Sequence, residues 1–345
     1  MTIMLEEIKS QPEILARLQV EAEEIVGDLA AKVMDRGIDL IILAARGTSD
    51  HAAVYGQYLL TYMTGLPVAL AAPSLVTLYR RPLKLANALV IGLSQSGEAA
   101  DVNEYLAAAR EGGALTAVIT NNSESTMAKS AEHLLLCRAG VEHAVAATKT
   151  YMAEMALLAM FSLALSTDQA AMPAEFAELP RHIAATINLE EEIKVRTERY
   201  AFIDECVVLA RGFNQATALE TALKIQETSH IGAKGFSAAD FLHGPIAMIH
   251  RGVPTLFFAP SGVAMHGLLE TALKVRERGG ELIIFSDDES LLSLGKHSFP
   301  LPSVAEWLSP FTCITAAQLF ACYLALAKGY NPDRPRGLTK VTVTH

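Results

Sequence analysis

The sequence predicts an α/β protein with two similar three-layer α/β/α domains, and two observations support that prediction. An apolar run that ends in Arg-Gly occurs at Arg46-Gly47 and again at Arg211-Gly212, and a Ser-Gly pair occurs at 96–97 and again at 261–262. Both repeats lie 165 residues apart. Short, unbroken apolar runs also alternate with helical patterns, which is typical of a parallel sheet covered on both faces. We therefore expect a duplicated domain, each copy with a flavodoxin-like parallel sheet.

The first copy is expected to follow a helical N-terminal segment. Residues 5–35 carry apolar side chains at helical spacing, with Glu21, Glu23 and Glu24 turned to solvent. Three apolar runs then end at turn residues, as expected of strands that lead into helices or loops. The predicted elements of this copy are strands 40–45, 88–93 and 115–120, a helix that ends near 62 and a helix over 99–110.

The second copy repeats this order. Its predicted elements are strands 207–210, 255–259 and 282–286, a helix over 214–229 and a helix that ends at Gly279-Gly280. Pro173 and Pro180 interrupt the pattern between the copies and predict a linker there. The predicted division is an N-terminal helical segment 1–35, a first domain 36–166, a linker 167–195, a second domain 196–330 and an irregular C-terminal tail 331–345.

Composition limits the classes of partner. Apolar residues make up 51% of the chain and charged residues 19%, enough to fill two cores. The net charge of -10 argues against nucleic acid as the main partner. The most apolar helical stretch found in the sequence, Met155–Leu165, is shorter than the roughly 18 residues of a membrane span. We interpret it as a buried or interface helix, and the N-terminus shows no signal pattern.

The cysteines predict reduced, buried thiols. The chain has four, and none forms a C-x-x-C pair. His133 and His143 flank Cys137 without a second cysteine, which is a weak pattern for a metal site. We therefore expect a cytoplasmic protein that needs neither a metal nor a cofactor.

Hydroxyl-bearing residues follow two predicted strands. In a parallel sheet, ligands bind outside the carboxyl ends of the strands, and a helix N-terminus there favours an anion. Neither turn carries a dinucleotide or nucleoside-triphosphate motif, so a single phosphate is the expected ligand. The alternative is ordinary helix capping by Ser and Thr. The residues concerned are Thr48, Ser49, Ser94, Gln95 and Ser96.

Ionisable residues cluster in the second copy. Glu220, Lys224 and Glu227 fall within about 60° of arc on one predicted helix. The simplest interpretation is an exposed Glu–Lys pair, worth a few tenths of a kcal/mol. The alternative is chemistry on a sugar phosphate, in which a carboxylate moves a proton between C1 and C2 and His243 assists ring opening. Taken alone, Lys340 is an ordinary solvated lysine.

These motifs together resemble the sugar isomerase (SIS) domain family, and in particular the tandem-domain isomerase half of glucosamine-6-phosphate synthase. The resemblance covers nearly the whole chain and rests on six short motifs in the same order. They are 46–49 (Arg-Gly-Thr-Ser), 93–98 (Leu-Ser-Gln-Ser-Gly-Glu), 145–149 (Val-Ala-Ala-Thr-Lys), 218–224 (Ala-Leu-Glu-Thr-Ala-Leu-Lys), 243–245 (His-Gly-Pro) and the tail 333–340.

The resemblance implies a role for each of these residues. Glu227 is implied as the base that moves the C1–C2 proton and His243 as the ring-opening group, supplied by the neighbouring subunit of a homodimer. Lys224 and Lys340 are implied as lysines that close over the sugar. The implied substrate-binding residues are Thr48, Ser49, Ser94, Gln95, Ser96, Ala99, Val145, Ala147, Glu220 and Thr339.

The chain departs from the family pattern in three places. Ala99 and Ala147 stand where the family usually has Thr and Ser, so two hydroxyls are absent from the expected site. The synthase also has an N-terminal glutaminase domain with a nucleophilic Cys, whereas about forty residues, beginning Met1-Thr2, precede the first strand here. We therefore expect the reverse reaction, as in stand-alone SIS-type deaminases.

The expected reaction takes glucosamine 6-phosphate to fructose 6-phosphate and ammonia. Three alternatives remain: a deglycase for a fructosamine 6-phosphate such as fructoselysine 6-phosphate, an isomerase-only protein like the synthase half, and a non-catalytic sugar-phosphate sensor. The tail 333–340 resembles the aminosugar branch more than the deglycases. A sensor would not need Glu227, His243 and Lys340 together.

Overall fold

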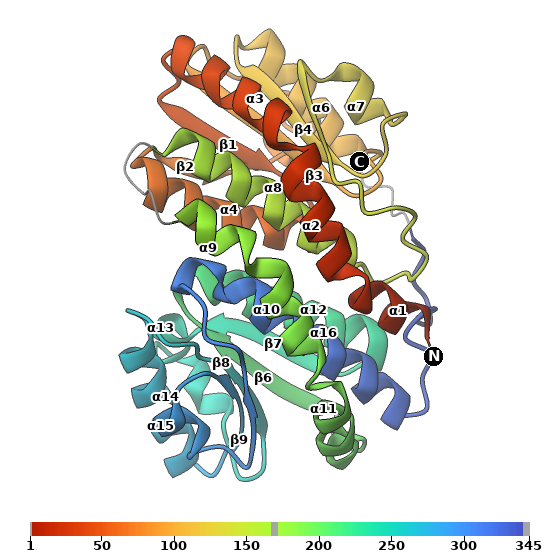
Figure 1. Cartoon of the computed structure of the whole chain (residues 1–345), viewed down its shortest axis with the longest axis vertical. Coiled ribbons are helices and arrows are strands. Elements are labelled where there is room, and N and C mark those ends of the chain that lie inside the picture. The colour runs from red at the N-terminus through yellow and green to blue at the C-terminus, as the bar shows by residue number, and fades with distance from the viewer. Residues whose placement is uncertain (1, 167–171, 341–345) are drawn as a thin grey trace. The chain divides into compact units, whose positions relative to one another are not determined.

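The computed structural model describes residues 2–166 and 172–340, and this part of the chain forms two compact units (Figure 1). The first unit contains residues 13–142, 149–166, 172–177 and 339–340. The second unit contains residues 2–12, 143–148 and 178–338. The N-terminal residues and the short segment 143–148 therefore belong to the second unit, although they precede it in the sequence.

The first unit is built on a parallel sheet of strand order β2-β1-β3-β4-β5. Its register pairs Ile42 with Val90 and Val90 with Thr116. The inner strands are almost wholly buried, as a parallel sheet with helices on both faces requires. The strands are β1 (Leu40–Ala44), β2 (Val68–Leu70), β3 (Ala88–Ser94), β4 (Leu115–Thr120) and β5 (His133–Leu136).

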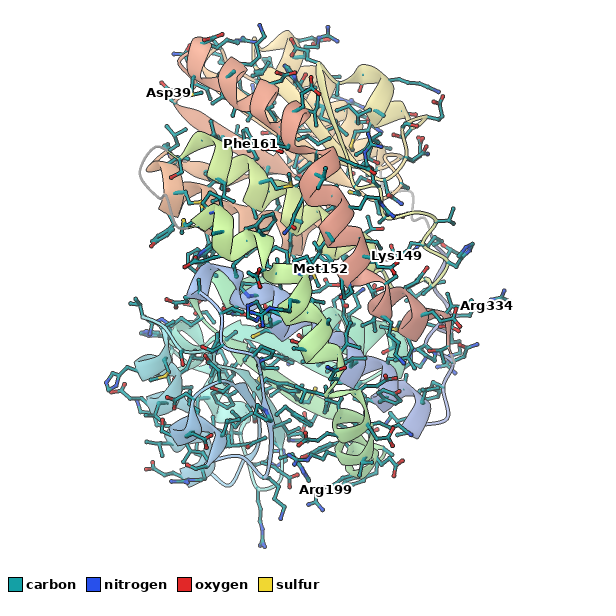
Figure 2. The ribbon with its side chains drawn as sticks, viewed as in Figure 1. Asp39, Lys149, Met152, Phe161, Arg199 and Arg334 are labelled. Carbon is teal, nitrogen blue, oxygen red and sulfur yellow. The ribbon has the colours of Figure 1, made fainter. Side chains whose placement is uncertain are left out.

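Helices cover both faces of this sheet. The helices α4 and α8 pack together and α3 packs on α8, while α6 packs against β3 and β4 and contacts α5 and α7. Phe161 of α8 is fully buried and Asp39 is exposed (Figure 2). The helices are α2 (Gln11–Glu21), α3 (Glu23–Asp35), α4 (Thr48–Thr64), α5 (Ser74–Thr77), α6 (Ala100–Glu111), α7 (Thr126–Ser130), α8 (Lys149–Leu165) and α9 (Met172–Ala177).

The second unit repeats the sheet. Its order is β10-β9-β8-β6-β7, all parallel, which is the order of the first sheet when each copy is numbered from its own first strand. This 2-1-3-4-5 order is that of flavodoxin-like folds, so the predicted fold class is confirmed. The strands are β6 (Glu205–Ala210), β7 (Gly232–Ser237), β8 (Pro254–Phe258), β9 (Glu281–Ser286) and β10 (His297–Pro300).

The second sheet is also a middle layer. Helix α12 packs against β6, β7 and α16, and α14 packs against β8 and β9. The core beneath α14 includes Phe257, Leu268 and Val275. The helical elements are α1 (Ile3–Lys9), α10 (Leu179–Ile187), α11 (Glu190–Thr197), η1 (Glu198–Tyr200), η2 (Gly212–Asn214), α12 (Gln215–Ser229), α13 (Ala238–Phe241), η3 (Pro245–Met248), α14 (Met265–Glu277), α15 (Glu289–Leu292), η4 (Glu306–Leu308) and α16 (Ser309–Ala327).

The six strands predicted from the sequence are present, within one or two residues of the expected bounds. The four strands that sequence analysis missed, β2, β5, β7 and β10, are the outer strands of the two sheets. The segment over 5–35, predicted as one helical region, is divided into α1, α2 and α3, with Glu21, Glu23 and Glu24 exposed as expected. The segment 167–195, predicted as a linker, contains α9, α10 and part of α11, and its residues 167–171 lie outside the described part.

Two helices are apolar around their whole circumference. The stretch Met155–Leu165 belongs to α8 and is mostly buried, in agreement with the sequence interpretation. The sequence analysis overlooked a longer apolar helix: Glu306–Ala327 has the length and composition of a membrane span, but 89% of its 18-residue window is buried. Helix α16 is therefore a core helix of the second unit, because it packs on α10, α11 and α12.

Candidate active site

The first hydroxyl loop joins β1 to α4. Gly47 has a φ of 56° and occupies the N-cap position, and it contributes no capping side chain to the helix. Thr48 and Ser49 are therefore the first residues of α4 rather than its cap. Ser49 is 7% exposed, and its Oγ donates a hydrogen bond to Oε1 of Glu154 on α8 at 2.9 Å.

The second hydroxyl loop joins β3 to α6. Ser94 ends β3, and its Oγ accepts a hydrogen bond from the N–H of Gly97 at 3.1 Å. The Oγ of Ser96 accepts from the N–H of Glu98 at 3.3 Å. Gly97 has a φ of 68°, and a Cβ there would lie 2.1 Å from the Oγ of Ser125, so only glycine fits this turn.

Both loops are held by contacts within the first unit. Arg46 Nε lies 2.7 Å from Oδ2 of Asp101, a buried residue in the first turn of α6, so this ion pair joins the two loops. The main-chain oxygen of Gln95 accepts hydrogen bonds from Thr120 Oγ1 at 3.3 Å and from the N–H of Asn121 at 3.2 Å. The hydroxyl groups are therefore presented from a supported backbone.

The capping interpretation of these loops is wrong. The N-cap residues are Gly47 for α4 and Ala99 for α6, and neither forms a side-chain capping bond. The missing hydroxyl at Ala99 leaves the start of α6 without a side-chain cap. Backbone N–H groups and the helix dipole at this strand end favour a bound anion.

The ionisable cluster lies on α12 in the second unit. Lys224 Nζ is 3.3 Å from Oε1 of Glu220 and also forms a short ion pair with Glu227. The side chains of Lys224 and Glu220 are 1% and 0% exposed, whereas that of Glu227 is 23% exposed. The interpretation as an exposed surface pair is therefore wrong, because two of the three side chains are buried.

Electrostatics keep the lysine charged. Burial alone would lower the pKa of Lys224, but the carboxylates of Glu220 and Glu227 raise its pKa above the usual value for lysine. A buried ammonium between two carboxylates is costly unless all three groups are paired. Among the three, Glu227 alone keeps an exposed edge at which a ligand can be reached.

His243 lies in the turn after α13 and is exposed. Its N–H donates to the main-chain oxygen of Asp240 at 3.0 Å, which fixes the backbone of the turn. A role for this ring at a neighbouring subunit's site remains a prediction from the sequence.

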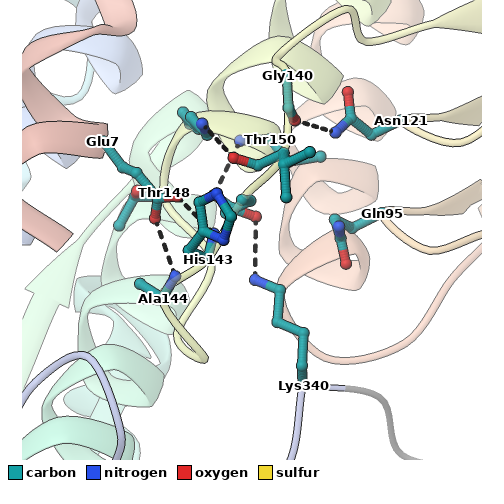
Figure 3. A network of polar contacts seen from close by, with 12 residues as sticks. Glu7, Gln95, Asn121, Gly140, His143, Ala144, Thr148, Thr150 and Lys340 are labelled. Atoms are coloured by element: carbon teal, nitrogen blue, oxygen red, sulfur yellow. Dashed lines mark hydrogen bonds and ion pairs between the residues drawn. The ribbon is translucent and has the colours of Figure 1, made fainter. Parts of the chain in front are cut away.

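The segment 143–148 is anchored inside the second unit. The carboxylate of Glu7 accepts the N–H groups of His143 at 2.6 Å and Ala144 at 3.2 Å (Figure 3). The N–H of Val145 donates to the main-chain oxygen of Asp333 at 3.1 Å. Ala147 follows in the same segment and is partly buried.

Asp333 also fixes the start of the chain. Its carboxylate accepts the N–H groups of Ile3 at 3.0 Å and Met4 at 2.8 Å, at the N-terminus of α1. The tail motif that begins at Asp333 therefore has a structural role in addition to the role implied for its lysine.

Lys340 is not an ordinary solvated lysine. Its Nζ lies 3.4 Å from Oε2 of Glu142, whose side chain is 0% exposed (Figure 3). Oε1 of Glu142 accepts the N–H of Thr150 at 3.2 Å, at the start of α8. This carboxylate thus fixes the tail lysine beside the first unit, while Thr339 before it is exposed.

The structure places the predicted site residues in two groups. The first unit holds Thr48, Ser49, Ser94, Gln95, Ser96, Ala99, Thr339 and Lys340. The second unit holds Val145, Ala147, Glu220, Lys224, Glu227 and His243. Sequence reasoning missed Glu142 and Glu154; the signal at Glu154 was a lone acid at the start of an otherwise apolar helical stretch.

Metal chemistry finds no support at the cysteines. All four thiols are free and buried, and burial raises the pKa of Cys137 well above its usual value. Residues 2–166 and 172–340 contain no group of three His, Cys, Asp or Glu side chains with the geometry to hold a metal ion.

Comparison with known proteins identifies the repeated fold. The family model of the SIS domain matches twice, over residues 38–164 and 203–328. The chain belongs to the SIS domain family. The two matches contain the two parallel sheets described above.

Related proteins share this arrangement over nearly the whole chain. A glutamine–fructose-6-phosphate aminotransferase (isomerizing) of Acidithiobacillus ferridurans is 35% identical over 359 residues, covering 99% of this chain. The chain spans 58% of that relative's length. The C-terminal domain of a Francisella tularensis glucosamine-fructose-6-phosphate aminotransferase superposes with a TM-score of 0.88 at 25% identity, covering 96% of this chain and 98% of that one. A Thermotoga maritima glucosamine-6-phosphate deaminase has a TM-score of 0.79 at 20% identity, covers 99% and 100% of the two chains, and shows the shared fold.

In the second SIS copy, a carboxylate of the same unit lies at the helix N-terminus that follows the equivalent loop. The loop between β8 and α14 contains Ser261-Gly262, at the position of Ser96-Gly97 in the repeat. The carboxylate of Glu306 accepts the N–H groups of Val263 at 2.9 Å and Ala264 at 3.2 Å. An internal carboxylate therefore occupies this helix N-terminus in the second copy.

Proposed function

We propose that this SIS protein is an aminosugar-phosphate deaminase/isomerase. The proposed reaction opens the ring of glucosamine 6-phosphate and transfers the C2 proton to C1. The resulting C2 imine takes up water and releases ammonia, leaving fructose 6-phosphate. One water is consumed for each ammonia released, and no electrons are exchanged, so no redox cofactor is required.

The observation that carries the proposal is the pairing of Glu227 with Lys224. A carboxylate with an exposed edge is suited to accept a proton from carbon, and the buried lysine beside it can stabilise negative charge that develops on the substrate. The geometry supports a phosphosugar substrate as well, since the β3–α6 loop offers hydroxyls and an uncapped helix N-terminus. Membership of the SIS family supports the same class of ligand.

The proposal gives each remaining residue a role. Ser94, Gln95 and Ser96 bind the phosphate, with Thr48 beside it. His243 opens the ring from the partner subunit of a cytoplasmic homodimer, and Lys340 closes over the sugar. The pairing of Lys340 with Glu142 supports this last role, because it fixes the amine at the first unit.

Incubation with glucosamine 6-phosphate tests the proposal directly. Ammonia and fructose 6-phosphate should form together, with one ammonia released for each fructose 6-phosphate. Turnover of fructoselysine 6-phosphate with no turnover of glucosamine 6-phosphate would replace the proposal with a deglycase. Formation of an isomerised sugar without ammonia would indicate an isomerase-only protein, and binding of both compounds without turnover would indicate a sensor.

A further inference from the structure

The N-terminal helix α1 buries an acid among apolar side chains. The helix packs on α16 in the second unit, and its buried residues are Met4, Leu5, Glu7 and Ile8. Glu7 is 5% exposed. Burial of a carboxyl group costs free energy unless hydrogen bonds compensate it, so a position that served packing alone would favour an apolar residue. The contacts of Glu7 therefore indicate why an acid stands in this helix.

Glu7 uses both of its oxygens to hold the start of the segment 143–148. Oε1 accepts the N–H of His143 at 2.6 Å, and Oε2 accepts the N–H of Ala144 at 3.2 Å (Figure 3). The next N–H, that of Val145, donates to the main-chain oxygen of Asp333 at 3.1 Å. Because these consecutive N–H groups are occupied, the main chain here can offer a ligand only its carbonyl oxygens.

Every second residue of this segment is buried, and the residues between them are at least partly accessible. Val145 and Ala147, the two residues of the segment that are implied in substrate binding, belong to the accessible set. The far end of the segment is also held, because Nε2 of Gln318 donates to the main-chain oxygen of Thr148 at 3.4 Å. The segment is therefore fixed at both ends, with its implied binding residues on the accessible side.

We propose that Glu7 is a positioning residue for sugar binding: it fixes the segment 143–148 so that the main-chain oxygens of this segment accept hydrogen bonds from hydroxyl groups of the sugar. Glu7 acts through the main chain and does not touch the ligand. Phosphate binding at Ser94 and Ser96 in the first unit does not depend on it. The inference rests on the proposed function for the class of ligand, a phosphorylated sugar, and for the part that Val145 and Ala147 take in binding it.

Calorimetry with two probes tests this inference. Inorganic phosphate reports the phosphate-binding loop alone, and glucitol 6-phosphate reports phosphate and hydroxyl groups together, without a carbonyl group to be turned over. For Glu7→Leu, the Kd of glucitol 6-phosphate should rise about 10-fold, the value expected for one lost hydrogen bond, while the Kd of phosphate stays the same. With glucosamine 6-phosphate as substrate, KM should rise by a larger factor than kcat falls.

Two further variants separate positioning from the packing of α1. Glu7→Gln keeps an acceptor oxygen for one of the two N–H groups, so its Kd for glucitol 6-phosphate should lie between those of Glu7→Leu and the unmodified protein. Lys9→Met removes an ion pair of the same helix, that of Lys9 Nζ with Oε2 of Glu190 at 2.7 Å, and should leave both Kd values unchanged. Hydrogen exchange over 143–148 should be faster in Glu7→Leu and unchanged in Lys9→Met.

Each outcome decides between the alternatives. An unchanged Kd of glucitol 6-phosphate in Glu7→Leu, or an equal rise in Lys9→Met, would overturn the inference, as would a Glu7→Gln variant that binds no better than Glu7→Leu. Failure of the unmodified protein to bind either probe would overturn the inference and the proposed function together. Selective weakening of glucitol 6-phosphate by Glu7→Leu, in a protein that releases no ammonia from glucosamine 6-phosphate, would support the inference and overturn only the deaminase proposal.

Discussion

The two SIS copies have the same strand order but opposite contents at equivalent positions. In the first copy, the loop before α6 carries Ser94 and Ser96, and the helix has no side-chain cap. In the second copy, Glu306 already binds the N–H groups before α14. The topology therefore creates a place for an anion in both copies, and the side chains decide whether an external anion or an internal carboxylate fills it.

The helix that follows the first strand also differs between the two copies, but here the second copy carries the ionisable side chains. The 165-residue offset pairs Glu220 and Lys224 of α12 with Tyr55 and Leu59 of α4. All four side chains are fully or almost fully buried. A buried ionic group costs stability where an apolar one would not, so its presence on α12 indicates function rather than packing. The proposed function accordingly assigns binding to the first copy and proton transfer to the second.

The largest expected effect is at the proposed base. Glu227→Gln removes the carboxylate but keeps its shape, and kcat should fall by about 10³-fold, in the range expected for loss of a general base. Binding of glucitol 6-phosphate should change little. Glu270→Gln, at an exposed acid of α14, is the control and should retain full activity. Retention of activity in Glu227→Gln would place the base elsewhere.

The buried lysine should have the next largest effect, measured on stability. Lys224→Met leaves the buried carboxylate of Glu220 without its lysine and should cost about 3 kcal/mol of unfolding free energy. Chemical denaturation measures this change. Lys129→Met, which removes a lysine that is 63% exposed, should be close to neutral.

The pH dependence of Lys224→Met gives an independent check. The raised pKa of Lys224 means that its charge stabilises the native protein at all pH values below the usual pKa of lysine, and the contribution is lost only as the pH rises through the folded value. The stability difference between the unmodified protein and Lys224→Met should therefore be fully present near neutral pH and shrink as the pH rises above the usual pKa of lysine. The opposite slope would contradict the buried-pair interpretation.

Matched serine variants address the comparison of the loops. Ser94→Ala should raise the Kd of inorganic phosphate about 10-fold through loss of one hydrogen bond to a charged group. Ser261→Ala, in the loop of the second copy, should leave this Kd unchanged, because Glu306 already occupies the neighbouring N–H groups. Equal effects would mean that both copies bind phosphate.

The smallest effect is expected when the carboxylate is removed from the loop between β8 and α14 in the second copy. Glu306→Ala removes the carboxylate from the N–H groups of Val263 and Ala264. A weak second phosphate-binding event should then appear in phosphate titrations. Absence of any second event would contradict the interpretation that Glu306 closes an anion site in the second copy.

The sequence predicted the centre of each sheet and missed its edges. Inner strands such as β3 are continuous apolar runs because helices cover both faces. The outer strands are short or carry polar residues: β2 has three residues, and β7 contains Lys234 between two glycines. Such segments acquire their conformation by pairing with a neighbour, and a local pattern contains little sign of that pairing.

The sequence also indicated two groups of candidate site residues but not their surroundings. Helical spacing placed Glu220, Lys224 and Glu227 on one face, yet it gave no means to decide that this face is buried. The contact between Ser49 and Glu154 joins residues 105 positions apart, and the pair of Lys340 with Glu142 joins residues 198 apart. Such pairings depend on tertiary packing, so sequence spacing alone did not predict them.

The stoichiometry of phosphosugar binding tests the central claim, that one SIS copy binds and the other is closed. Titration of the unmodified protein with glucitol 6-phosphate should give one site per chain, with binding weakened by Ser94→Ala and unaffected by Ser261→Ala. Two equivalent sites per chain, or binding that depends equally on both serines, would contradict the account.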